Sequence, residues 1–275
     1  MGPFRLALWG GMASLVTPLA NAHDGVLATA RAGEQMALDD LAGVKALAFD
    51  VFGTVVDYRG TIIAEGEALN HSSGLAVDWA AFADAWRAQY RPNMDLVARG
   101  ELPWMNLDAP HRRALDELLE RFGVTTLDEE QKRRLNRVWH RLRPWPDAVA
   151  GLTRLHAKYI LTTLSNGNVA LLVEMARHAG LPWDVIFSAE LTQTYKPDPR
   201  AYQMTYRLLD LRPDEVMLVA AHPDDLRAAH GQGLRACFVP RPLEAGPRSQ
   251  PPTIAEPEVD LVAGDFLELA RLLGA

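Results

Sequence analysis

The sequence predicts an α/β protein in which a doubly wound parallel sheet, a Rossmann-like core, carries an inserted helical cap. The first observation is a series of short, unbroken apolar runs separated by helical segments, which is typical of strands buried on both faces of a parallel sheet. The second is the segment from about 61 to 142, whose apolar residues have helical spacing and which contains no strand pattern. A helical block between the first strand and the rest of the core indicates an insertion.

The individual elements follow from the same periodicities. Strands are expected at 44–49, 159–165, 184–190, 215–221, 235–240 and 260–264. Helices are expected at 147–157, 168–179, 199–209, 224–231 and 266–273. The core domain is therefore predicted to comprise residues 44–60 and 143–275, and the cap residues 61–142. A proline-rich stretch at 241–258 is expected to form an exposed loop.

The composition restricts the classes of partner. The chain has 275 residues and a formal net charge of −7, which argues against nucleic acid or an anionic membrane as the main partner. Cys237 is the single cysteine, so the chain has no internal disulfide.

The N-terminal residues 1–35 have two interpretations. An apolar stretch at 6–20 followed by "ANA" before His23 has the outline of a cleaved signal peptide, which would place the protein in the periplasm. Alternatively, Met36 is the true start and residues 1–35 are an untranslated upstream extension. We expect the second case and a cytoplasmic protein. The apolar stretch is too short to span a bilayer in either case.

Polar residues follow four of the expected strands, at the edge where parallel sheets bind ligands. They are Asp50 after the first strand, Ser165 and Asn166 after the second, Lys196 after the third, and His222, Asp224 and Asp225 after the fourth. Taken singly, several of these residues would be interpreted as helix caps. Together they predict one polar site at this edge of the sheet.

The chemistry of such a site is coherent. A lysine beside Asp50 would keep the carboxylate ionised and nucleophilic, because a nearby cation favours the charged form. Thr54, Ser165 and Asn166 would donate hydrogen bonds to an anionic substrate or to a developing oxyanion.

The motifs "FDVFGTVVD", "LSNG", "YKPD" and "AAHPDD", in this order and with a helical insert after the first, resemble the haloacid dehalogenase superfamily. Phosphatases of that superfamily place a second aspartate, a general acid, at the position that Phe52 occupies here. An aromatic ring cannot protonate a leaving alkoxide, whereas a halide leaves without a proton. Phe52 therefore disfavours a phosphatase and suits a dry pocket.

The sequence most resembles the type II L-2-haloacid dehalogenases. "AWRAQY" places Arg87 where that family has a cap arginine, which implies that Arg87 holds the departing halide or the substrate carboxylate. Tyr202 matches a family tyrosine near the site. The "AAHPDD" motif departs from the family's "SSNAWD", so that Ala220, His222 and Asp224 replace a serine, an asparagine and an aromatic residue. These changes put the substrate range in doubt.

The resemblance implies that Asp50 displaces halide from a short 2-haloalkanoic acid, forming an ester that water then hydrolyses with inversion at C2. His222 and Asp225 would position that water, and His222 is a candidate general base. We expect no cofactor, no metal and a small-molecule haloacid as the partner, with a homodimer as the assembly that fits the family. Two alternatives are a Mg²⁺-dependent phosphatase or phosphonatase, with Asp50 and Asp225 as ligands, and a binding protein without activity.

Overall fold

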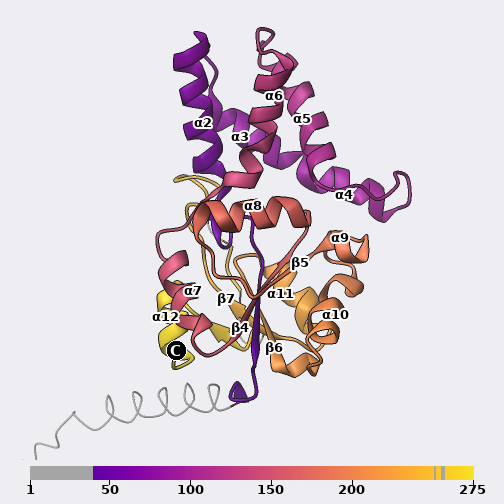
Figure 1. Ribbon diagram of the computed structural model, residues 1–275, viewed down its shortest axis with the longest axis vertical. Coiled ribbons are helices and arrows are strands. Elements are labelled where there is room, and N and C mark those ends of the chain that lie inside the picture. The colour runs from indigo at the N-terminus through magenta and orange to yellow at the C-terminus, as the bar shows by residue number, and fades with distance from the viewer. Residues whose placement is uncertain (1–39, 251, 255–257) are drawn as a thin grey trace, which may run out of the picture. The chain divides into compact units, whose positions relative to one another are not determined.

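The core of the protein is a six-stranded, fully parallel sheet with the strand order β5-β4-β1-β6-β7-β8. The computed structural model describes residues 40–250, 252–254 and 258–275 (Figure 1). The strands are β1 (Ala46–Phe49), β4 (Ile160–Ser165), β5 (Val185–Ser188), β6 (Val216–Ala220), β7 (Arg235–Phe238) and β8 (Leu261–Val262). All six lie within the ranges expected from the sequence, and the predicted α/β class is confirmed.

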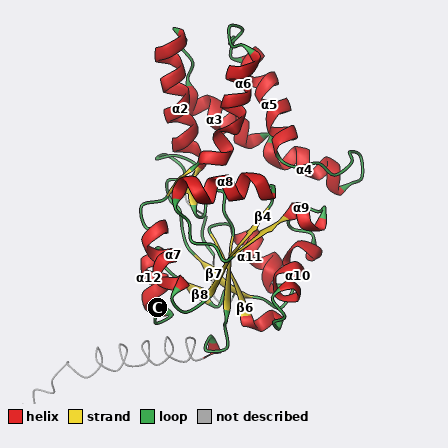
Figure 2. Ribbon diagram, in the orientation of Figure 1, coloured by secondary structure: helices red, strands yellow, loops and turns green. Residues whose placement is uncertain are grey.

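Helices cover both faces of this sheet. The helices α10 (Pro199–Leu208) and α11 (Pro223–His230) pack on one face, and α7 (Ala148–His156) and α12 (Phe266–Leu272) lie on the other (Figure 2). The helix α8 (Val169–Ala179) contacts β5 and continues toward the cap. Strand β1 is fully buried between these layers, which explains why its sequence is apolar on both faces.

The cap is helical throughout. It comprises α2 (Tyr58–Ser73), α3 (Trp79–Ala88), α4 (Tyr90–Ala98), α5 (Asp108–Arg121), α6 (Glu129–Asn136) and the 3₁₀-helix η1 (Arg137–Arg141). Its interior is aromatic: Trp86 and His111 both pack against Trp139, the latter with its ring stacked at a centroid distance of 4.3 Å. Apolar residues at helical spacing produced this block, as the sequence predicts.

Two short strands that the sequence did not reveal connect the cap to the core. β2 (Val56–Asp57) pairs antiparallel with β3 (Arg143–Pro144), so the chain leaves and re-enters the core at one place. A second contact comes from His140, which lies between Asp108 at 2.8 Å and Glu174 of α8 at 3.0 Å. The short helices α9 (Ala189–Thr192) and η2 (Pro213–Glu215) were also not anticipated.

The interpretation of residues 1–35 lies outside the described residues. Among the residues that are described, no helix is both long enough and apolar enough to cross a membrane.

Candidate active site

The site lies where the sheet strands end, and Asp50 is its centre. Asp50 follows β1 directly and is 7% exposed. Its Oδ1 accepts a hydrogen bond from Lys196 Nζ at 2.9 Å. Its Oδ2 accepts one from Thr54 Oγ1 at 2.7 Å and lies 3.0 Å from His222 Nδ1. Burial alone would raise the pKa of Asp50, but the Lys196 charge and the His222 and Thr54 hydrogen bonds outweigh it, so that the pKa lies well below its ordinary value.

The turn after Asp50 is built around Gly53 and Thr54. Gly53 has a φ of +85°, a conformation that glycine adopts without steric cost. The turn brings the fully buried Thr54 hydroxyl back under Asp50, where it also accepts a hydrogen bond from the Ala221 backbone N–H at 2.9 Å. Thr54 therefore links the end of β1 to the end of β6.

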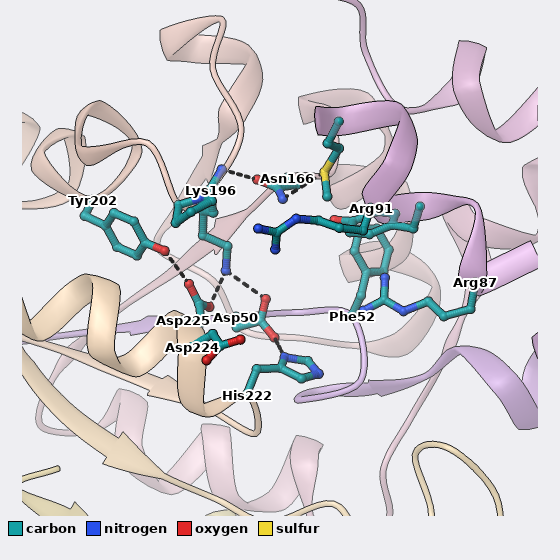
Figure 3. A pocket seen from close by; sticks show the side chains of 13 residues that line it. Asp50, Phe52, Arg87, Arg91, Asn166, Lys196, Tyr202, His222, Asp224 and Asp225 are labelled. Carbon is teal, nitrogen blue, oxygen red and sulfur yellow. Dashed lines mark hydrogen bonds and ion pairs between the residues drawn. The ribbon is translucent and has the colours of Figure 1, made fainter. Parts of the chain in front are cut away.

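Lys196 lies between two carboxylates. Its Nζ is 2.9 Å from Asp50 and 2.5 Å from Asp225 Oδ2, and Tyr202 donates its hydroxyl to the other oxygen of Asp225 at 2.7 Å (Figure 3). Burial lowers the pKa of Lys196, but the two carboxylates raise it by more, so that the ammonium stays charged. Asp225, whose pKa burial raises, has both oxygens occupied by Lys196 and Tyr202. These two contacts fix the Asp225 side chain against Lys196 and Tyr202.

His222 bridges Asp50 and a second acidic residue that the sequence did not point to, Glu244. His222 Nε2 lies 2.9 and 3.1 Å from the two carboxylate oxygens of Glu244. Burial lowers the pKa of His222, but the hydrogen bonds to Asp50 and Glu244 raise it to about 10. Glu244 belongs to the stretch expected to be an exposed loop. That expectation is wrong for two of its residues, because Arg241 is 8% exposed and the Glu244 side chain 13% exposed, whereas Leu243 between them is 58% exposed.

A pocket of about 460 Å³ opens above Asp50, between the strand ends and the cap. The cap contributes Arg87, Tyr90, Arg91 and Met94, and the core contributes Asp50, Phe52, Asn166, Lys196, Pro197, Tyr202, His222, Asp224 and Asp225. Phe52 is 2% exposed and packs edge-on against Tyr90 and Trp139, which makes this wall apolar.

Two cap arginines point into the pocket (Figure 3). Arg87 stacks on Tyr90, with its guanidinium carbon 4.3 Å from the ring centroid, and on Tyr58 at 5.0 Å. Its Nη1 is buried and has no hydrogen-bond partner, so it is a charged donor available for an anion. Arg91, which the sequence did not single out, directs its guanidinium toward the Lys196 side of the pocket, and its Nε donates to Asp95 at 3.0 Å.

Ser165 and Asn166 end β4 with different environments. Asn166 lines the pocket, where its Oδ1 accepts from the Lys196 backbone N–H at 2.8 Å and its Nδ2 contacts Met94 Sδ at 3.2 Å. Ser165 is 1% exposed, and its Oγ accepts from the Gly167 N–H at 3.1 Å. It does not line the pocket, so its described contact shapes the turn before α8.

The pocket thus combines an ionised carboxylate, a buried ammonium, a free guanidinium and an apolar wall at the strand ends of a parallel sheet. A family model for haloacid dehalogenase-like hydrolases matches residues 44–233. The chain belongs to the haloacid dehalogenase-like hydrolase family. The predicted superfamily and the hydrolase class are therefore confirmed.

Similar proteins are haloacid dehalogenases. The (S)-2-haloacid dehalogenase 1 of Pseudomonas sp. (strain CBS-3) is 30% identical over 201 residues, which are 72% of this chain and 85% of the relative. The crystal structure of the L-2-haloacid dehalogenase PA0810 has 49% identity and a TM-score of 0.81 over 84% of this chain and 99% of that one. The defluorinating L-2-haloacid dehalogenase Rha0230 has 46% identity and a TM-score of 0.80, over 84% of this chain and 96% of its own.

Proposed function

We propose that the protein hydrolyses short (S)-2-haloalkanoic acids to 2-hydroxy acids through an ester on Asp50, with inversion at C2. The observation that carries the proposal is the pairing of Asp50 with Lys196 at 2.9 Å beside the apolar ring of Phe52. This arrangement keeps a carboxylate ionised for attack and offers no acid at the place where an alkoxide leaving group would need one. Halide is a leaving group that suits it.

In the first step an Asp50 oxygen attacks C2 of the substrate, and the carbon–halogen bond breaks with its electron pair departing as halide. Arg87 takes an anion in this step, either the departing halide or the substrate carboxylate, through its unpartnered Nη1. The apolar wall at Phe52 and the cap above it exclude water, which strengthens these charge interactions.

In the second step water attacks the carbonyl carbon of the Asp50 ester and releases the 2-hydroxy acid. Lys196 and Thr54, which contact the two carboxylate oxygens, stabilise the oxyanion that forms there. His222 is the candidate general base, because its Nδ1 lies 3.0 Å from Asp50 Oδ2. Asn166 and Tyr202 line the pocket and shape the substrate subsite.

The alternative of a Mg²⁺-dependent phosphatase or phosphonatase is not favoured by the residues. Phe52 stands where those phosphatases have their general acid, and its ring cannot donate a proton. In addition, Asp50 and Asp225, the two carboxylates that would hold the ion, are already paired with the Lys196 ammonium. The carboxylates of Asp50 and Asp225 therefore do not fit a divalent ion.

Halide release tests the proposal. Purified protein should release chloride from (S)-2-chloropropionate and not from the (R) enantiomer, and the product should be the (R)-hydroxy acid. The Asp50→Asn variant is the control for background hydrolysis. Fluoroacetate is included in the same assay. Activity on phosphate esters that requires added Mg²⁺, without halide release, would replace the proposal by the alternative.

A cytoplasmic location and a homodimer belong to the same proposal. The intact mass of the protein from its native host should correspond to a start at residue 36 or 37, whereas a start at His23 would indicate an exported protein. Light scattering during gel filtration measures the assembly.

A further inference from the structure

We infer that Glu244 and His222 form a dyad that drives the hydrolysis of the ester, with Glu244 as the positioning residue and His222 as the base. The inference deepens the proposed function and rests on it. Its basis is the line of contacts from Asp50 through His222 to Glu244.

The geometry assigns each imidazole nitrogen a separate task. Nδ1 faces the nucleophile, 3.0 Å from Asp50 Oδ2, and Nε2 faces Glu244 at 2.9 and 3.1 Å. A carboxylate on Nε2 keeps the proton on that nitrogen in the neutral ring. The lone pair is then on Nδ1, beside the carbon that water must attack, as in other dyads in which an acid orients a histidine.

The loop that carries Glu244 is anchored so that the carboxylate is held in place. Arg241 donates Nε to the Thr54 carbonyl at 2.8 Å and forms a two-pronged ion pair with Asp147 at 2.7 and 2.9 Å. The Glu244 backbone N–H in turn donates to the Arg241 carbonyl at 3.0 Å. Gly53 leaves the necessary room, because a Cβ there would lie 2.1 Å from Glu244 Oε1. Gly53, in the turn after Asp50, and Arg241, in the loop after β7, thus both position the Glu244 side chain.

Esterification changes the charge around His222. In the free enzyme the ring contacts two carboxylates and its pKa is raised to about 10, so it is protonated and donates to both. Lys196 also contacts Asp50, and both Arg87 and Tyr58 lie close enough for their pKa values to be affected by the charge of Glu244. When Asp50 becomes an ester its negative charge disappears. Only Glu244 then holds the proton, the pKa of His222 falls, and the Nδ1 proton passes to solvent.

The neutral ring then completes the reaction. Nδ1 takes a proton from the attacking water as the oxygen bonds to the ester carbon. The tetrahedral intermediate collapses, the bond from this carbon to the hydroxy acid oxygen breaks, and His222 returns the proton to that oxygen. The second proton of the water passes from the new Asp50 carboxyl to His222 and restores the resting state. The sum is one haloacid and one water converted to one hydroxy acid, one halide and one proton.

The dyad is tested by separating the two chemical steps. In rapid-quench experiments with (S)-2-chloropropionate, Glu244→Gln should release one halide per enzyme at nearly the wild-type rate and then slow by ten- to a thousand-fold. The peptide containing Asp50 should carry the ester mass in the slow phase. Glu244→Asp keeps the carboxylate and should recover part of the rate. Glu117→Gln, which removes one exposed carboxylate of the cap, is the matched control.

The pH dependence provides a readout that a merely structural role would not change. Ester hydrolysis requires neutral His222, so its rate should rise with pH through the pKa of His222 in the ester. Glu244→Gln removes an anion that raises this pKa, so the acid limb should move to lower pH while the plateau falls. An unshifted limb, or equal slowing of both steps, would overturn the dyad. A wild-type protein that releases no halide would instead refute the proposed function itself.

Discussion

Replacing Arg87 by methionine separates catalytic from structural importance. Arg87 is partly buried, its buried Nη1 has no hydrogen-bond partner, and its guanidinium lies over the rings of Tyr58 and Tyr90. Loss of one preorganised donor to a developing anion costs about 3 kcal/mol, roughly a hundredfold in kcat/KM. Arg87→Lys should also lose activity, because a point charge does not reproduce the planar guanidinium stacked between two rings.

The thermal stability of Arg87→Met should not fall with its activity. Burying the Nη1 end of a guanidinium without a partner is costly, and a methionine of similar length removes that cost while losing two cation–π contacts of about 1 kcal/mol each. We therefore expect the melting temperature of Arg87→Met to be unchanged or higher. The assay pairs halide-release kinetics with thermal unfolding, and Arg121→Met, an exposed cap arginine, is the control. A variant with near-normal kcat/KM would return Arg87 to a packing role.

Other predictions concern the nucleophile, the metal, the turn and the histidine. Asp50→Asn should lose about 10⁴-fold or more of the activity. When the wild-type enzyme completes a single turnover in ¹⁸O-water, the hydroxy acid should be unlabelled while the Asp50 peptide gains mass. Label in the first product would overturn covalent catalysis. EDTA should leave chloride release unchanged, and a loss that Mg²⁺ restores would contradict this. Gly53→Ala should lower the unfolding temperature, measured by calorimetry, by about 3–6 °C through backbone strain. It should also slow ester hydrolysis by displacing Glu244, and unchanged kinetics would disprove the contact between Gly53 and Glu244. The raised pKa of His222 contributes stability that is fully present below its ordinary value of 6.5 and is lost as the pH rises toward about 10. The difference in unfolding free energy between wild type and His222→Asn, measured by urea denaturation, should therefore shrink over this range. A constant difference would refute the ion pairs.

The sequence predicted the residues that follow strands better than those that lie on loops. Asp50 and His222 were predictable because the carboxyl ends of parallel strands meet at one edge, and a polar residue after an apolar run marks that edge. Lys196 lies eight residues beyond the end of β5 and was found through the order of the motifs. Glu244 was missed because it lies in a proline-rich stretch without periodicity and matches no motif of the site. Nothing local in that stretch indicates that an arginine anchors it to the Thr54 carbonyl.

Pairings within the site were also beyond the sequence. Asp225 was expected to position the hydrolytic water together with His222. The first turn of α11 directs it to Lys196 and Tyr202. Arg91 follows Arg87 by four residues, which on one helix would place both on the same face. The boundary between α3 and α4 at Gln89 falls between them, so only the folded chain shows that both reach the pocket.

The pairing of β2 with β3 makes the cap an exchangeable cassette. Val56 lies opposite Pro144 and Asp57 opposite Arg143, so the two chain crossings are neighbours, with Cα atoms about 5 Å apart as in any antiparallel pair. A short hairpin turn would therefore close the core if the cassette were removed. Asp50, Lys196 and His222 all belong to the core, whereas both pocket arginines belong to the cassette. Grafting a different cassette onto these two strands would replace both arginines of the pocket while leaving Asp50, Lys196 and His222 in place.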